Sequence, residues 1–464
     1  MSALRTDADE RVRAFFAPDL PILAARAPGR LDVMGGIADY SGAVVLELPL
    51  ACATTALLQR QPARRCDVVT RRGGAWQRFT ADLDPIVSGE LRAPEALGTW
   101  VAAREPTAWP AYVLGVVQWC AHHLAGCAGG AAQGFRLLLD SDVPEGKGVA
   151  SSAALEVAVM MAVAHSCGGR LSDLELAAAC QQVEHRAVGA PCGIMDQVTS
   201  ACGRRGHLLR LRCQPASIEG HVAVPHGYRF YGIDSGERHA VTGADYATVR
   251  TAAFMGYRII AEAAGFAATR EGARIHVADP LWRGYLANIS SREFDERFAP
   301  LLPERLDGAE FLDRFGGTTD PATVVRRDRS YPVRAATAHP VHEQARVTRF
   351  AQLLEQLPGN ARAARELGDL MRAAHASYGA CGLGSPGTDR LVELVTEEGP
   401  DHGLFGAKIT GGGSGGTVAI LGTSDAEPLV RRIALAYGTE TGRATAVFAE
   451  SGPGASATGV QQVA

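Results

Sequence analysis

Short runs of apolar residues alternate along the chain with longer segments of helical spacing, and this pattern predicts a mixed fold. Runs rich in Val, Ile, Leu and Phe predict strands at residues 43–50, 135–139, 228–233 and 416–421. Helices are predicted at residues 151–165, 171–185, 346–356 and 361–375. The predicted helix 151–165 opens with serines and is rich in Ala, Met, Leu and Glu. Helices and strands are therefore expected in both halves of the chain.

The length of 464 residues favours two domains. The strand at 228–233 starts a new unit, so we place the boundary near residue 225, with domains 1–225 and 226–464. The first ten residues and residues 451–464 are polar or rich in Gly, Ser and Ala. Such composition is typical of disordered ends.

Composition excludes several classes of protein. The formal net charge is −4 and the pI about 6.4, which argues against a nucleic-acid partner. The longest apolar stretch, 157–163, is too short to cross a bilayer. Ten cysteines without CxxC spacing argue against a zinc site, and acidic residues stand where a signal peptide would be apolar. We expect a reduced cytoplasmic protein without a membrane partner.

A glycine loop runs directly into the predicted helix 151–165. It contains Gly146, Lys147 and Gly148, followed by Ser151 and Ser152. Glycines let the backbone approach a ligand closely, and the free N–H groups at a helix start attract an anion. The spacing differs from a Walker A loop. The alternative interpretation is a plain strand-to-helix turn capped by serine.

A second glycine run, residues 407–417, contains Gly412 and Gly413. Ordering so many glycines on folding costs much conformational entropy. Their presence therefore favours a bound ligand or a close approach of two backbones at this run. A flexible linker is the alternative, but the flanking segments are apolar and strand-like. Lys147 and Lys408 are the only lysines of the chain, and both lie in glycine-rich segments where an ammonium group would face phosphate.

A few charged residues lie in apolar surroundings. Asp196 is the lone acid of residues 192–197, and such a carboxylate is a candidate for catalysis. Arg30 is its candidate partner. Glu184 lies on the preceding predicted helix and by itself reads as a solvated residue, whereas Asp39 reads as a turn acid after two glycines.

Three segments in one order resemble the signature motifs of GHMP kinases. They are Ala-Pro-Gly-Arg ending at Arg30, the loop from Pro144 to Ala153, and Lys-Ile-Thr-Gly-Gly-Gly beginning at Lys408. Further motifs resemble the galactokinase branch, among them Glu-His at 184–185, Cys-Gly-Ile-Met-Asp-Gln at 192–197 and His-Ala-Ser at 375–377. Within that branch, residues 30–42, 143–147, 232–236 and 381–384 resemble the kinase domain of plant-type L-arabinokinases.

The resemblance implies an α+β protein with two domains and an active site between them. The N-terminal domain would be an α/β unit of the ribosomal-protein-S5 type, and the C-terminal domain a ferredoxin-like α+β unit. ATP would be the co-substrate, with Mg²⁺ as the metal. By motif match, Asp196 would be the general base or a charge anchor, and Arg30 would orient it. The other implied site residues bind ligands: Gly36, Asp39, Gly193 and Tyr246 for the sugar; Gly146, Lys147, Gly148, Ser151, Ser152, Gly412 and Gly413 for ATP; and Ser151 or Ser152 with Glu184 for magnesium.

Two positions depart from the galactokinase pattern. Galactokinases carry Glu-His, which serves the C6 hydroxyl of the sugar, where this chain has Gly36 and Ile37. Since L-arabinose is galactose without C6 and its hydroxyl, we expect phosphorylation of L-arabinose at the anomeric C1 oxygen. Ala150 stands where galactokinases have a third serine, which leaves open whether Ser151 or Ser152 meets magnesium.

The sequence leaves other substrates and roles open. Galactose, fucose and a uronic acid are alternative substrates, the last of which would recruit a cation such as Arg238 or Arg334. A sugar sensor without catalysis is disfavoured because Ser152, Ala153 and the charged residues above are all present. A Rossmann dehydrogenase is excluded by the spacing of both glycine loops. The expected assembly is a monomer or a weak dimer.

Overall fold

The computed structural model describes residues 14–72, 75–105, 107–125, 133–237, 244–271 and 274–463. The first ten residues, for which we expect disorder, and Arg238 lie outside the described residues.

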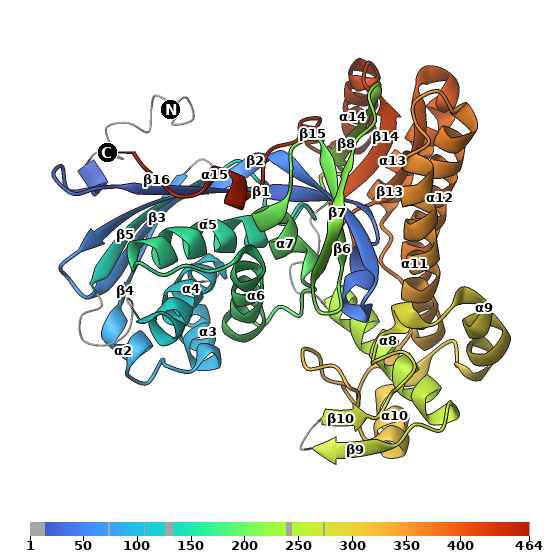
Figure 1. Ribbon diagram of the computed structural model, residues 1–464, viewed down its shortest axis with the longest axis horizontal. Helices are drawn as coiled ribbons and strands as arrows, with labels where there is room; N and C mark the ends of the chain where they lie inside the picture. Colours follow the sequence, from blue (N-terminus) through green and yellow to red (C-terminus); the bar gives the residue numbers. More distant parts are fainter. Residues whose placement is uncertain are drawn as a thin grey trace.

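A large mixed sheet forms the first half of the molecule (Figure 1). Its two longest strands, β1 (Leu23–Met34) and β2 (Val44–Gln61), pair antiparallel and are buried along most of their length. The strand order is β16-β1-β2-β5-β3-β4, where β16 is Gln461–Gln462, and β6 pairs with β2 and β7 with β6. The remaining strands are β3 (Arg65–Arg72), β4 (Ala75–Asp82), β5 (Gly134–Ser141), β6 (His207–Arg212) and β7 (Ser217–Ala223). The expected strands 43–50 and 135–139 are confirmed as parts of β2 and β5.

Helices cover one face of this sheet (Figure 1). They are α2 (Leu83–Val87), α3 (Pro94–Ala102), α4 (Trp109–His123), α5 (Ser151–Ser166), α6 (Asp173–Val183) and α7 (Met195–Cys202). Helix α5 is apolar on all sides and lies at the centre of the core, as a helix that packs against other elements all round must. Ser172 and Glu175 form a capping box that starts α6, so the predicted helix 171–185 is confirmed within two residues at each end.

A second sheet, ordered β13-β14-β8-β15, forms the other half. Its strands are β8 (Tyr228–Asp234), β13 (Leu404–Ile409), β14 (Thr417–Thr423) and β15 (Val447–Phe448). Helices α13 (Pro386–Glu398) and α14 (Glu427–Thr441) pack against one face, and α11 (Val333–Leu354) and α12 (Ala361–Ala380) join the other face to the first sheet. One hydrophobic cluster contains residues of β1, β2, α5, β8, α11 and α12, so the two halves share a core.

Residues between α8 (Ala244–Ala263) and α11 form a smaller lobe, at the lower right of Figure 1. It contains the hairpin β9 (Ala268–Glu271) and β10 (Arg274–Val277), the helix α10 (Gly308–Phe315), and the short pair β11 (Leu306–Asp307) and β12 (Ser330–Tyr331). Helix α11 begins at Val333 and not near 346 as expected. Pro340 lies inside it, and a proline within a helical pattern is the usual signal of a boundary.

Two expectations about the chain were wrong. Residues 451–463 are ordered against the first sheet: Ala455 is fully buried, and Gln461 and Gln462 form β16, which pairs with the edge of β1. Small residues there allow close packing, as where the Gly454 amide donates to the carbonyl of Gly203 at 2.8 Å. Cys167 is disulfide-bonded, in contrast to the expected reduced state, whereas the other eight described cysteines are free.

A buried ion pair connects the two sheets. Lys408 on β13 lies 2.7 Å from Asp32 on β1, and both side chains have no solvent exposure. The same carboxylate accepts the amides of Gly36 at 3.0 Å and Gly411 at 3.3 Å. The hydroxyl of Thr410 accepts the Asp32 amide at 2.8 Å. Every polar atom of the pair therefore has a partner in low-dielectric surroundings, as a buried charge requires.

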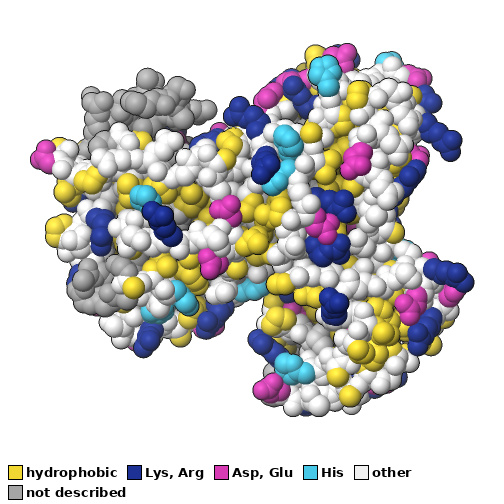
Figure 2. Space-filling model, in the orientation of Figure 1, with side chains coloured by type: hydrophobic (Ala, Val, Ile, Leu, Met, Phe, Trp, Pro, Cys, Tyr) yellow, Lys and Arg dark blue, Asp and Glu magenta, His cyan; other side chains and the backbone are white. Residues whose placement is uncertain are grey.

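Acidic and basic side chains are interspersed on the face shown in Figure 2, with apolar side chains scattered between them. Within the described ranges, no helix combines the length and apolarity that a bilayer crossing needs.

We predict that Lys408→Met lowers the free energy of unfolding by about 3–5 kcal/mol, because it leaves the Asp32 carboxylate buried without a cation. The measurement is equilibrium denaturation in urea. Adding Asp32→Asn to this variant should recover more than half of the loss, since an amide keeps the acceptor without the charge. Arg431→Met is the control, because its exposed pair with Glu427 contributes less than about 1 kcal/mol. A Lys408→Met loss as small as that of the control would contradict the interpretation.

Candidate active site

The two glycine loops lie against each other. A β-carbon on Gly148 would come within 3.2 Å of the Thr410 carbonyl, and one on Gly416 within 2.8 Å of the Lys147 carbonyl. The Thr417 hydroxyl donates to that same Lys147 carbonyl at 2.8 Å. Gly148 and Gly416 also have positive φ. The glycines are therefore required by the close approach of two backbones, and a flexible linker is ruled out for residues 411–416.

The start of α5 offers free backbone donors. Its N-cap residue, Ala150, has the left-handed conformation (φ 59°, ψ 47°), and no side chain caps the helix. Ser151 and Ser152 are half-buried in the first turn, so the serine-capped turn that the sequence left as an alternative is not what forms. A strained non-glycine residue before an uncapped helix is typical of a functional site, and the free N–H groups with the helix dipole suit an anion.

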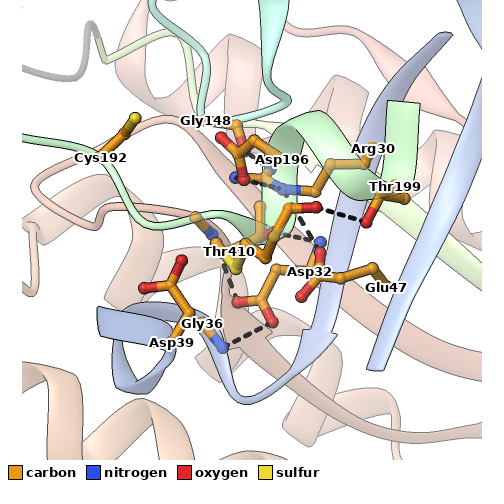
Figure 3. A network of polar contacts seen from close by, with 12 residues as sticks. Arg30, Asp32, Gly36, Asp39, Glu47, Gly148, Cys192, Asp196, Thr199 and Thr410 are labelled. Carbon is orange, nitrogen blue, oxygen red and sulfur yellow. Dashed lines mark hydrogen bonds and ion pairs between the residues drawn. The ribbon is translucent and has the colours of Figure 1, made fainter. Parts of the chain in front are cut away.

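Arg30 and Asp196 form the centre of the site (Figure 3). Nε and Nη2 of Arg30 lie 2.9 and 2.8 Å from Oδ1 of Asp196. Nη1 of Arg30 donates to the Gly148 carbonyl at 2.5 Å, so the guanidinium joins Asp196 to the first glycine loop. Burial opposes the charge of Arg30, but the carboxylates of Asp196, Glu47 and Asp32 raise its pKa above the ordinary value. The guanidinium is therefore charged at every relevant pH.

One of the two lysines lies away from the position expected of it. Lys408 is fully buried and pairs with Asp32, so it does not face phosphate. Its side chain points from β13 into the joint of the sheets because successive residues of a strand point to opposite faces. The ammonium of Lys147 lies 3.1 Å from Oδ1 of Asp234 and is 16% exposed. It remains at the rim of the loop.

Glu47 on β2 is a site residue that sequence reasoning missed, because it lies in an ordinary strand pattern. Its carboxylate is fully buried, and Oε2 lies 3.3 Å from Nε of Arg30. Burial raises the pKa of Glu47 well above its ordinary value, and the neighbouring Asp32 adds to the effect. Glu47 and Asp196 both lie beside the guanidinium of Arg30 (Figure 3).

Glu184 is buried, so the interpretation of this residue as part of a solvated helix face was wrong. It begins η5 (Glu184–Val188), a π-helical turn of the kind that marks functional sites. Gln197 Nε2 donates to its Oε2 at 2.7 Å, and the Tyr112 hydroxyl lies 3.4 Å from Oε1. Burial and the charge of Asp196 raise the pKa of Glu184 to about 7, although hydrogen bonds from Ser152 and other neighbours oppose the rise.

The residues around Glu184 fit a magnesium ion. Glu184 supplies a buried carboxylate, and Ser152 at the start of α5 is the hydroxyl-bearing residue that lowers its pKa. A second buried carboxyl, Glu156, has Oε1 without a hydrogen-bond partner. Excess buried negative charge favours a cation. Magnesium is usually bound through one or two protein carboxylates together with substrate phosphates.

Asp39, Gly193 and Tyr246 come together beside Asp196. A β-carbon on Gly193 would lie 1.5 Å from Oδ2 of Asp39, so only glycine fits. The amide of Tyr40 donates to Oδ1 of Asp39 at 2.6 Å. Burial raises the pKa of Asp39 to about 7, with a further contribution from the charge of Asp196. Tyr246 on α8 is half-buried and packs edge-on against Tyr40, with ring centroids 5.8 Å apart.

Gly36 has a conformation and an environment that exclude a side chain. Its φ is +46°, and a β-carbon would lie 1.8 Å from the Tyr378 hydroxyl and 2.7 Å from Oδ2 of Asp32. That hydroxyl accepts the Ile37 amide at 2.9 Å and donates to the Gly411 carbonyl at 3.0 Å. Tyr378 therefore fills the space that a longer residue at position 36 would use. The Ile37 side chain is buried in an apolar cluster.

Arg250 on α8 also contacts this region and was not found from sequence. Its guanidinium donates to both oxygens of Asp320, at 2.8 and 2.7 Å, and to the carbonyls of Pro191 and Cys192, at 3.0 and 3.1 Å. No motif signals this contact, because Arg250 and Asp320 are 70 residues apart.

Comparison with known proteins gives two family matches. The model of the GHMP kinases N terminal domain matches residues 111–204, and that of the GHMP kinases C terminal domain matches residues 351–439. A galactokinase of Chloroflexus aggregans is 30% identical over 91% of this chain and 90% of its own length. An L-arabinokinase of Arabidopsis thaliana is 38% identical over 94% of this chain, which spans only 46% of that relative.

Solved structures show the same fold. Lactococcus lactis galactokinase, crystallised with galactose, aligns with a TM-score of 0.71 at 20% identity over 98% of this chain and 99% of its own. A mevalonate kinase aligns with a TM-score of 0.53 at 14% identity, over 92% and 99% of the two chains. The packed glycine loops and the buried Arg–Asp pair are consistent with the two domain matches and with a relative matched over about nine-tenths of both chains. This chain belongs to the GHMP kinase family.

Proposed function

We propose that this GHMP kinase transfers the γ-phosphoryl group of ATP to the anomeric C1 hydroxyl of a galactose-configured sugar, with L-arabinose as its substrate and L-arabinose 1-phosphate as its product. The observation that carries the proposal is the Arg30–Asp196 pair beside the uncapped start of α5. It joins an acceptor for a hydroxyl proton to a loop suited to phosphate.

Asp196 would act on the sugar hydroxyl. Arg30 holds Oδ1, so Oδ2 is the oxygen that would accept the hydrogen bond, and the side chain is 21% exposed. In phosphoryl transfer, positioning and charge stabilisation provide most of the rate acceleration. A carboxylate fixed through one oxygen suits that task, either as a general base or as an electrostatic anchor.

Arg30 and the first glycine loop would serve the transferred group. Nη1 of Arg30 contacts the carbonyl of Gly148, two residues before the uncapped helix start, so its positive charge lies beside the place where phosphate would bind. Gly146, Lys147, Ser151, Gly412 and Gly413 would complete the nucleotide site. Mg²⁺, which would neutralise phosphate charge when bound, would be held by Glu184 and Ser152.

The sugar would bind between Asp39, Gly193 and Tyr246. The wall formed by Gly36 and Ile37 presents no polar side chain, because Tyr378 excludes one at position 36 and Ile37 is buried among apolar residues. A C6 hydroxyl placed there would lose water without gaining a partner, which costs about 1–3 kcal/mol. This supports a pentose over galactose.

The positions of the arginines weigh against a uronic acid. Arg334 donates to the Leu302 carbonyl at 2.8 Å, in the smaller lobe. Arg250 is the described cation that interacts with Asp39, and four of its N–H groups are already used by Asp320 and two carbonyls. A sugar carboxylate would therefore add a third negative charge beside Asp39 and Asp196 without a free cation among these described residues.

Asp196→Asn should lower kcat by about two to four decades, because the amide neither accepts a proton nor carries charge. ATP affinity, measured by calorimetry, should stay within about twofold, since the substitution leaves the backbone donors of the glycine loops and Arg30 in place. The rate is measured as ADP release with saturating L-arabinose and magnesium. A variant that retains most of its turnover would show that another group carries the reaction.

Asp39→Asn should stabilise the protein while weakening sugar binding. Because the pKa of Asp39 is raised to about 7, the folded state binds its proton more tightly than the unfolded state, so wild-type stability falls as pH rises from about 4 to about 7. The variant avoids this cost, which is on the order of 1–4 kcal/mol above pH 7. Melting temperatures between pH 4 and 8 should therefore diverge over this window and stay separated above it.

Asp67→Asn is the control of opposite sign. Burial disfavours its charge, but hydrogen bonds from Gln61, Arg65 and others outweigh it and lower the pKa of Asp67 to about 2. The stability that this carboxylate contributes is present above pH 4 and is lost as pH falls towards 2, so Asp67→Asn should destabilise at neutral pH. If both variants shift stability in the same direction at pH 8, the assignment of Asp39 as a cost to folding is wrong.

The wild type should favour L-arabinose over galactose in kcat/KM by about tenfold or more, the size expected from one unpaired buried hydroxyl. D-Fucose, which is galactose without the C6 oxygen, separates the causes. If the hydroxyl is responsible, D-fucose should react nearly as well as L-arabinose. If the C6 carbon is too large, D-fucose should be as poor as galactose.

Galacturonate and glucuronate should give the lowest rates of ADP release among the sugars tested. With L-arabinose, phosphorus NMR of the product should place the new phosphate on the C1 oxygen. A preference for galactose would make the enzyme a general galactose-type kinase. ATP and sugar binding without turnover of any sugar would support the sensor instead.

A further inference from the structure

The loop between η5 and α7, residues 189–194, carries Gly193 and leads directly to Asp196. Two side chains contact the same backbone carbonyl of this loop, that of Cys192. Nε2 of His185 lies 2.7 Å from the Cys192 oxygen, and Nη1 of Arg250 lies 3.1 Å from the same atom. Arg250 also binds the Pro191 carbonyl at 3.0 Å. The position of this loop therefore depends on a side chain from the second half of the chain.

Arg250 is itself rigidly held. Asp320 binds it through two oxygens, and the two side chains are 6% and 0% exposed. The Thr323 hydroxyl donates to Asp320 at 2.6 Å and the Ala322 amide at 3.1 Å, so the carboxylate is fixed as well. The guanidinium also lies over the ring of Tyr40, 5.4 Å from its centroid. A planar fork with this many partners has one orientation.

The same cation acts on the neighbouring carboxylate. Burial and Asp196 raise the pKa of Asp39, and the positive charge of Arg250 opposes that rise. Arg250 therefore favours the ionised form of Asp39, which is the better acceptor for sugar hydroxyls. Loop position and carboxylate charge are controlled by one residue.

We propose that Arg250, anchored by Asp320, is a positioning residue for the sugar: it fixes loop 189–194, and through it the spacing of Gly193 and Asp39 from Asp196. The inference rests on the proposed sugar site. Through Asp320, the smaller lobe between α8 and α11 takes part in sugar binding.

The test compares Arg250→Lys and Asp320→Asn with the wild type. Lysine keeps the charge but cannot span a carboxylate and two carbonyls, and Asp320→Asn leaves the arginine without its anchor. We expect KM for L-arabinose to rise about tenfold in each variant, the cost of about one charge-assisted hydrogen bond. KM for ATP should stay within about twofold, a separation that general destabilisation would not produce.

Arg258→Lys is the matched control. Arg258 lies on the same helix, is 8% exposed and pairs with Glu262 at 3.6 Å, but has no contact to loop 189–194. It should lower the melting temperature and leave both KM values within about twofold. If either site variant does not fold, Arg250→Met with Asp320→Leu removes both charges together, so that no unpaired charge stays buried. It should show the same selective rise.

The outcomes separate the two proposals. Failure of the wild type to release ADP with any of the sugars would overturn the proposed function. A wild type that is active, with variants whose sugar KM is unchanged or rises in step with the ATP KM, would overturn the positioning role alone.

Discussion

The ion pair between Lys408 and Asp32 is the constraint on which the rest of the site depends. It joins strands that are 376 residues apart and places the end of β13 against the end of β1. The second glycine loop leaves β13 directly after Lys408, and Arg30 lies two residues before Asp32. The pair therefore holds the base of the second glycine loop beside Arg30, and its complete burial makes separation of the two strands costly.

Around this joint the protein gathers more negative than positive charge. Asp39, Glu47, Glu156 and Glu184 all have raised pKa values, with burial as the largest cause. The free-energy cost of burying these carboxyl groups is offset by the apolar cores that both sheets share with their helices. A cation and a polar ligand would relieve the repulsion. These buried carboxyl groups are therefore a cost to folding, and the proposed ligands would reduce it.

Much of the fold and part of the site were predictable from the sequence because local signals and motif order agree. The first glycine loop, helix α5, and strands β2, β5, β8 and β14 follow from apolar periodicity and glycine density. The Arg30–Asp196 contact came from one acid in an apolar segment and a motif match. The roles of these residues remain proposals.

Other features were not predictable because they depend on contacts remote in sequence. Glu47 looks like any strand residue, and Arg250 like a residue of a polar helix face, until folding places them beside Arg30 and Asp320. Lys408 was expected to face phosphate, but the alternation of the strand turned it inward. The order of residues 451–463 had no signal, since small residues that favour disorder also allow close packing.

That C-terminal segment has a consequence for biosynthesis. Val447 and Phe448 pair with β8 of the second sheet, and the chain then crosses to the first sheet, where Gln461 and Gln462 pair with Ala24 and Leu23 at the free edge of β1. During translation the first half emerges with this strand edge exposed, and exposed edges recruit other chains. The edge is closed only after residue 462 has left the ribosome. The start of β1 therefore gains its last strand partner through a contact remote in sequence, which is the kind of pairing that forms slowly.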